Sequence, residues 1–211
     1  MNTLPAPASI GEQLAEHFHR SVLALPTSPY AWTPPLIFQA VTGATAIVAD
    51  HSNIFQGAWP QGYRLDFGPL MFHILGGDRL VAADFLASAP PSNDAKYDAQ
   101  RGFYEFLRQV GWRVHLSKLL VSKNHWLENE EAVDGGVRAA VRRHATDPEV
   151  ETVVLLSGDG GMTNSVREAV RKGKKVVALA WRGTLHPALA AAASAHFYFD
   201  DLRSLLERRF C

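Results

Sequence analysis

The stretch from Val153 to Gly161 reads VVLLSGDGG, an apolar run that ends in small and acidic residues. The positions from Val153 to Leu156 are all apolar, as expected for a strand that is buried on both faces of a sheet. An acidic residue, Asp159, follows shortly after the strand ends. This pattern is typical of a parallel sheet that has helices on both faces.

The same alternation of strand and helix extends in both directions from this stretch. Further strands are predicted at residues 45–50, 79–85, 112–116, 175–181 and 195–199, and helices at residues 97–110, 130–144, 162–172, 186–193 and 200–209. Repeated strand–helix units favour a mostly parallel central sheet that is covered by helices. We therefore expect residues 45–211 to form a single α/β domain.

Residues 1–44 have a different character from the rest of the chain. Six of the twelve prolines fall within the first 35 positions. Ser9 and Glu12 form a capping box that begins one predicted helix, and residues 29–43 are predicted to be an extended connector. We interpret residues 1–44 as a proline-rich arm with one helix, not as a separate domain.

The composition excludes several classes of protein. Apolar residues make up 47% and charged residues 20% of the 211 residues, which is ordinary for a globular enzyme. The formal net charge of +0 indicates no general affinity for nucleic acid. The single cysteine, Cys211, allows neither an intrachain disulfide nor a cysteine-rich metal site. The chain has no signal-peptide pattern and no apolar run of about 20 residues, so we expect a cytoplasmic protein without a membrane span.

Acidic residues follow two of the predicted strands. Asp50 directly follows the apolar residues 46–49, and Asp159 follows residues 153–156. In open α/β sheets, ligands bind beyond the carboxyl ends of the strands. Neighbouring carboxylates repel each other unless a cation lies between them, and carboxylate oxygens suit Mg²⁺ or Mn²⁺. Asp134, near the start of a predicted helix, is the candidate for a third acid, although each of the three could instead cap a turn.

The motifs, in their order and spacing, resemble the NYN domain family of PIN-like ribonucleases. Residues 46–54, AIVADHSNI, resemble the family's opening, where an aspartate ends the first strand and an asparagine follows three residues later. Residues 131–134, EAVD, look like its Lys-Gly-Val-Asp segment, and residues 154–160 look like its Ser-Gly-Asp motif. Two later segments, residues 173–176 and 189–199, also match.

The resemblance, which covers about residues 45–206, implies a PIN-like three-layer α/β/α fold and metal-dependent hydrolysis of RNA. It implies that Asp50, Asp134 and Asp159 bind Mg²⁺ or Mn²⁺. By similarity, Asn53 orients Asp50 or contacts a metal-bound water. The implied substrate is RNA, expected to be single-stranded, and binding it would need basic and aromatic side chains around the site. The candidate substrate contacts are Ser157, Arg138, Arg142 and Lys174.

Three departures from the family pattern keep a second function open. Gly161 stands where the family usually has a further aspartate, Glu131 replaces a lysine, and His196 replaces an aspartate. The missing carboxylate favours a catalytically weakened protein that binds RNA or a protein partner without cleavage. The arm at residues 1–44 could cover the site or a partner subunit in a homo-oligomer, and the sequence does not choose between these.

A different α/β enzyme is the third alternative, with residues 157–161 acting as a phosphate-binding loop at a helix start. A phosphatase of the haloacid-dehalogenase type would need a second aspartate at position 52, which is Ser52. A dinucleotide-binding site would need glycines after the first strand, and residues 50–55 contain none. Both observations count against this alternative.

Overall fold

The computed structural model describes residues 36–202, apart from positions 59, 61, 63, 64, 76, 77, 93, 123, 124 and 128. Its centre is a six-stranded sheet in the order β3-β2-β1-β6-β7-β8. Every neighbouring pair of strands in this sheet is parallel. The strands are β1 (Thr45–Asp50), β2 (Leu80–Ala89), β3 (Arg113–Lys118), β6 (Thr152–Leu156), β7 (Lys175–Ala180) and β8 (Ala195–Tyr198).

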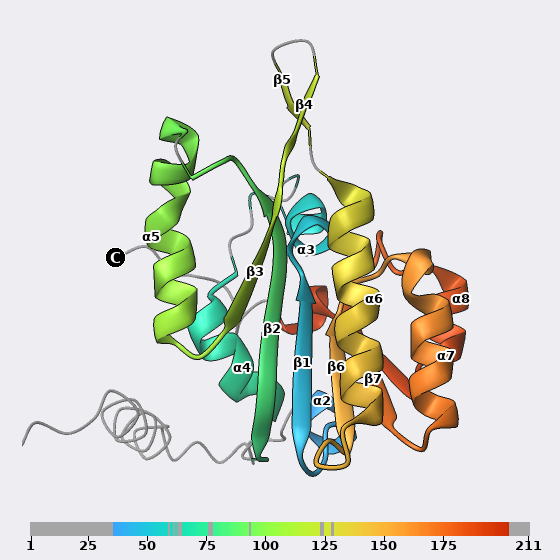
Figure 1. The fold of residues 1–211 in the computed structure, drawn as a ribbon. Helices are drawn as coiled ribbons and strands as arrows, with labels where there is room; N and C mark the ends of the chain where they lie inside the picture. The colour runs from blue at the N-terminus through green and yellow to red at the C-terminus, as the bar shows by residue number, and fades with distance from the viewer. Residues whose placement is uncertain are drawn as a thin grey trace, which may run out of the picture. The chain divides into compact units, whose positions relative to one another are not determined.

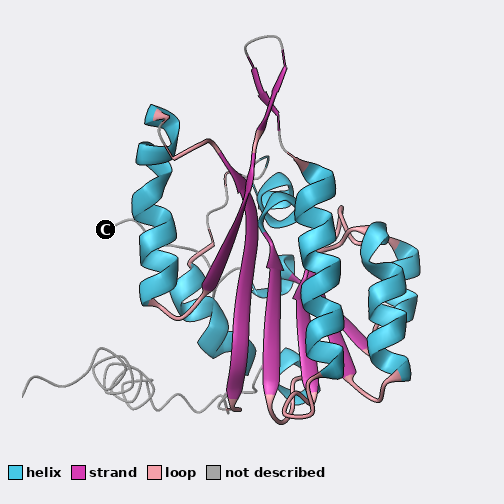
Figure 2. Ribbon diagram, in the orientation of Figure 1, coloured by secondary structure: helices cyan, strands magenta, loops and turns pink. Residues whose placement is uncertain are grey.

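Helices cover both faces of this sheet, which gives three layers (Figures 1 and 2). One face packs against α2 (Leu36–Ala40), α3 (His51–Ala58), α4 (Phe67–Leu75) and α5 (Ala95–Gln109). The other face packs against α6 (Glu130–Thr146), α7 (Thr163–Arg171) and α8 (Pro187–Ala192). The predicted three-layer α/β/α fold with a mostly parallel sheet is thus confirmed.

The alternation of side chains along β1 decides which way its last residue points. Ile47 and Ala49 pack in the core on the α3–α5 side, whereas Ala46 and Val48 pack in the core that contains α6. Because successive side chains of a strand point to opposite faces, Asp50 is directed to the same face as Val48. The first acid of the predicted site therefore lies on the side of the sheet that carries α6.

Most of the predicted elements are present, with shifted ends. The predicted strands at residues 45–50 and 152–156 coincide with β1 and β6, and the strand predicted at residues 79–85 continues to Ala89. The extended connector predicted at residues 29–43 is wrong where the structure describes it, because α2 occupies part of it. Its residue Ile37 is 1% exposed, so burial of an apolar face accounts for the helix.

Several parts of the chain lie outside the described residues or were not predicted. The predicted arm helix that begins at Ser9 lies outside the described ranges. So does most of the helix predicted at residues 200–209, of which the structure describes only the part that lies in the 3₁₀ turn η3 (Phe199–Leu202). The sequence did not predict α3, α4 or the hairpin of β4 (Leu120–Ser122) and β5 (His125–Leu127). This hairpin projects past the carboxyl ends of the sheet strands (Figure 1).

Within the part of the chain that the structure describes, no helix combines the length and the apolar character that crossing a bilayer needs.

Candidate active site

A cavity of about 520 Å³ lies at the carboxyl ends of β1 and β6. Four of the predicted site residues line it, which are Asp50, Asn53, Asp134 and Asp159. They come from four different elements, since Asp50 ends β1, Asn53 lies on α3, Asp134 lies on α6, and Asp159 precedes the 3₁₀ turn η2 (Gly160–Met162). The rest of the lining is Ser52, Gln56, Glu130, Gly158, Gly160, Gly183, Thr184, Leu185, His186 and Pro187.

Asp50 is the most buried of these acids, with 2% of its surface exposed. Its Oδ2 accepts a hydrogen bond from the Ser157 hydroxyl at 2.8 Å, and its Oδ1 accepts one from the backbone N–H of Asn53 at 3.3 Å. The pKa of Asp50 is raised to about 6, chiefly by burial and also by the charges of Asp134 and Asp159, while the hydrogen bonds from Ser157 and Asn53 act to lower it. The Asp50 carboxylate is therefore kept in an environment that disfavours its charge.

Asn53 and Ser157 tie the ends of β1 and β6 together. The Asn53 side-chain oxygen accepts the backbone N–H of Gly158 at 2.7 Å. Ser157 is fully buried, and its hydroxyl oxygen also accepts the backbone N–H of Asp159 at 3.2 Å. The Ser157 hydroxyl is thus bonded to Asp50 and to the backbone of Asp159, and its contact with substrate stays a prediction.

Asp134 and Asp159 complete the acidic lining. Burial raises the pKa of Asp134, the nearby charge of Asp159 raises it further, and Arg138 opposes both effects. Asp159 accepts the backbone N–H of Gly161 at 3.0 Å and so caps the 3₁₀ turn that follows. Since Asp134 and Asp159 both act on Asp50 and Asp159 also acts on Asp134, the three carboxylates are close enough to repel one another.

The donor chemistry of the cavity fits a hard divalent cation, because its charged lining residues are the carboxylates of the three aspartates and Glu130. Within the ranges that the structure describes, however, no group of three or more histidine, cysteine, aspartate or glutamate side chains is arranged to hold a metal ion directly.

Of the three basic side chains predicted to contact substrate, one lies near the cavity and two lie away from it. Arg138 bonds Glu131 at 3.1 Å and lowers the pKa of Asp134, so it lies beside the acids. Arg142 instead bonds Glu168 on α7 at 3.1 Å. Lys174 donates to the carbonyls of Asp147 and Val150 at 2.7 and 2.6 Å.

The structure places Lys174 away from this cavity, at the other end of the sheet. It directly precedes β7, at the amino end of the sheet, whereas the cavity lies at the carboxyl ends of the parallel strands. Neither Lys174 nor Arg142 belongs to the cavity lining. Lys174 instead bonds the turn between α6 and β6, and Arg142 bonds α6 to α7.

Sequence reasoning missed one whole wall of the cavity, formed by residues 183–187. These residues follow β7, which ends at Ala180, so the rule that ligands bind beyond strand ends would have included them. The dipeptide His186–Pro187 was a further signal, because proline favours the first turn of a helix and the residue before it can act as a cap. Glu130, at the start of the helix predicted at residues 130–144, also lines the cavity and was not among the predicted site residues.

Residues 44–204 match the sequence profile of the NYN domain. The chain belongs to the NYN domain family. The family consists of PIN-like nucleases that are associated with RNA and typically use divalent metals, so the acids lie on a nuclease scaffold.

A solved structure has a similar architecture. The chain is similar to the crystal structure of a protein of unknown function from Vibrio parahaemolyticus, with 26% sequence identity and a TM-score of 0.59. The similarity covers 75% of this chain and 94% of the Vibrio chain. No curated protein matches the sequence.

Proposed function

We propose that this NYN protein is a metal-dependent ribonuclease that hydrolyses phosphodiester bonds of single-stranded RNA. The observation that carries the proposal is that Asp50, Asp134 and Asp159, from separate elements, line one cavity and disfavour each other's charge. Such a cluster stays ionised at neutral pH only at a cost, which a bound cation would offset. Clusters of acids with shifted pKa values in a cleft are typical of functional sites.

The three aspartates would hold Mg²⁺ or Mn²⁺, and the cation would neutralise the scissile phosphate and activate water. Ser157 and Asn53 act through Asp50, since their hydrogen bonds fix both of its carboxylate oxygens. Arg138 is the predicted substrate contact that remains beside the acids. A cytoplasmic location and a homo-oligomeric assembly stay predictions from the sequence.

A second function, RNA or protein binding without cleavage, is favoured by one feature of the same loop. Gly161 contributes only its backbone N–H, which caps Asp159, and brings no carboxylate of its own. A Cβ at this position would lie 2.9 Å from the Asp159 carboxylate. An aspartate here, as in the family pattern, would therefore require Asp159 to shift.

Cleavage of a mixed-sequence, single-stranded RNA in Mn²⁺, in Mg²⁺ and in EDTA distinguishes the two functions. We expect metal-dependent cleavage that falls on the order of 100-fold or more in Asp50→Asn, the scale on which one preorganised electrostatic group acts. Asp98→Asn, which changes an exposed acid on α5, is the matched control and should cleave like the wild type. Binding of RNA without turnover in any metal would support the second function, and cleavage that persists in EDTA would contradict the first.

A further inference from the structure

The cavity wall after β7 is bonded to the same loop that carries Asp159. The backbone N–H groups of Thr184 and Leu185 donate to the carbonyl of Trp181 at 3.0 and 3.2 Å, which makes a tight turn directly after the strand. The backbone N–H of His186 then donates to the carbonyl of Gly158 at 2.8 Å. This hydrogen bond joins the turn directly to the acidic loop.

Two glycines of the acidic loop let the turn after β7 approach so closely. A Cβ at Gly158 would collide with the backbone carbonyl of Thr184, and a Cβ at Gly160 would lie 2.8 Å from Cγ of the His186 ring. Contacts below 3.0 Å are not made by real side-chain carbons, so a side chain at either position would require the turn to shift. Gly158 thus leaves room for the backbone at Thr184, and Gly160 leaves room for the His186 ring.

A hydrogen bond to the backbone fixes which nitrogen of His186 carries a proton. Its Nδ1 accepts the backbone N–H of Ala188 at 3.1 Å and so caps α8. A ring nitrogen that accepts a hydrogen bond carries no proton, so the proton of the neutral ring is on Nε2. Among the hydrogen bonds made by the described residues, none uses this Nε2–H.

The side chains around this donor are chiefly acceptors. The acids Asp50, Asp134, Asp159 and Glu130 line the cavity together with His186, and Arg138 is already bonded to Glu131. A phosphate in this cavity needs donors besides a cation, because its free oxygens would otherwise face carboxylates. A neutral imidazole N–H can donate this hydrogen bond. Because it carries no charge, it does not compete with the cation for the carboxylates.

We propose that the Nε2–H of His186 donates a hydrogen bond to a phosphate oxygen of the RNA bound at this cavity. This inference rests on the proposed function and gives the site a substrate-binding residue from the wall after β7. The carboxylates then serve the cation, and His186 holds the phosphodiester against them.

Two substitutions separate the donor role of His186 from its role as a helix cap. Serine and asparagine both cap helices well, but only asparagine also keeps an N–H donor in its side chain. We expect kcat/KM for RNA cleavage to fall roughly 10-fold in His186→Ser, the size expected for one hydrogen bond to a charged group. In His186→Asn the loss should be clearly smaller, and the melting temperature of both variants should stay at the wild-type value.

The control is His196→Ser, which changes an exposed histidine on β8 that does not line the cavity. Equal kcat/KM in the wild type and both His186 variants would overturn the inference while leaving the nuclease intact.

If the wild type binds but does not cleave RNA, the same comparison is made on the Kd of a fluorescent RNA 12-mer in Mn²⁺. An unchanged Kd in His186→Ser then overturns the inference, and a wild type that neither cuts nor binds overturns the proposed function with it.

Discussion

Asp50 and Asp84 are two buried aspartates on adjacent parallel strands, with 2% and 0% of their surface exposed. Asp84 pairs in register with Val48, two residues before Asp50, so both acids are directed to the face that carries α6. Burial acts on both in the same direction, since it raises the pKa of each carboxyl group. What differs is the set of partners that each one meets.

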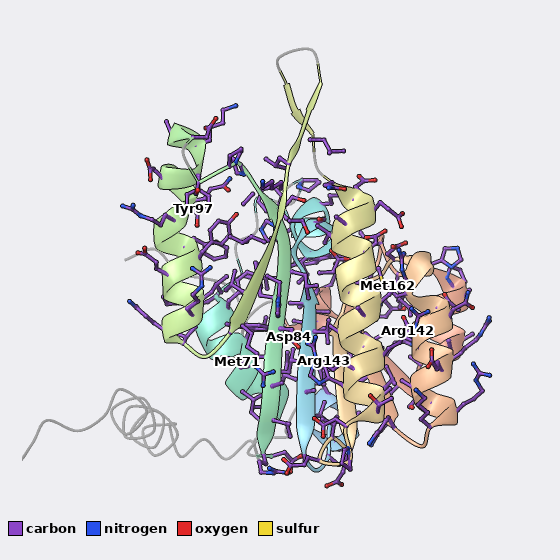
Figure 3. All side chains as sticks on the ribbon, in the orientation of Figure 1. Met71, Asp84, Tyr97, Arg142, Arg143 and Met162 are labelled. Carbon is purple, nitrogen blue, oxygen red and sulfur yellow. The ribbon has the colours of Figure 1, made fainter. Side chains whose placement is uncertain are left out.

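The partners of Asp84 are cationic or can donate a proton, whereas Asp50 faces other acids. Asp84 bonds the Nε2 atoms of His144 at 2.6 Å and His115 at 2.8 Å, and accepts a hydrogen bond from Arg143 at 2.7 Å. Figure 3 labels Asp84 on β2 and Arg143 on α6. Although burial opposes it, these contacts bring the pKa of Asp84 well below its usual value.

Both environments are made by the same helix. α6 has Asp134 near its amino end, beside Asp50, and Arg143 and His144 in its last turn, beside Asp84. This distribution follows the helix dipole, which favours acids at the start of a helix and bases at its end. A buried acid on this sheet face thus serves structure where its charge is neutralised, and is available for chemistry where its charge is disfavoured.

The largest effect on stability is expected from Asp84→Asn. The asparagine amide carries no negative charge to pair with Arg143 and His144. Its N–H₂ group would also face the hydrogen-bond donors of these residues. We therefore expect a loss of about 3–5 kcal/mol in the free energy of unfolding. Because the folded pKa of Asp84 is lowered, its stabilisation is present above the unfolded value of 3.8 and is lost as the pH falls below it. Urea denaturation at pH 7 and pH 3 measures both effects.

Asp98→Asn on the exposed side of α5 is the control for Asp84→Asn, since its surface ion pair with Arg101 contributes little. RNA cleavage per folded molecule should be unchanged in Asp84→Asn. A loss of cleavage without a loss of stability would contradict the assignment of Asp84 to structure and remove the contrast with Asp50.

In contrast to Asp84→Asn, the substitution Asp50→Asn is expected to raise the stability of the protein at neutral and higher pH. The folded pKa of Asp50, about 6, exceeds the unfolded value of 3.8, so the folded state holds its proton more tightly. Stability is therefore lost as the pH rises from about 4 to about 6, and the full cost, up to about 3 kcal/mol, remains above that range. Asparagine does not ionise, so the variant should be more stable than the wild type at pH 8 in EDTA and equal to it at pH 4.

Melting temperatures across this pH range, without added metal, test the prediction. An Asp50→Asn protein that is less stable than the wild type at pH 8 would show that the Ser157 and Asn53 hydrogen bonds outweigh the burial of the charge. Asp50 would then resemble Asp84, and the basis for its catalytic assignment would be weaker.

The two aspartates also show what the sequence could and could not predict. Asp50 and Asp159 were found because each follows an apolar strand, and the parallel topology brings strand ends together. Asp84 was missed because it lies inside a strand, although an aspartate within the apolar run LVAADFL signals a buried charge that needs partners. Its partners His115 and Arg143 are 31 and 59 residues away in the chain, and no local pattern encodes such contacts.

The smallest effect is expected from His115→Ala, which removes the outermost partner of Asp84. The His115 side chain is 48% exposed and that of His144 only 3%, although both bond the same carboxylate. We expect a loss of about 1 kcal/mol, since water can replace the exposed partner and His144 and Arg143 remain. Urea denaturation of His115→Ala beside Asp84→Asn measures the difference. A loss as large as that of Asp84→Asn would mean that the cluster depends on its exposed member, and the burial of His144 would then no longer explain why Asp84 keeps its charge.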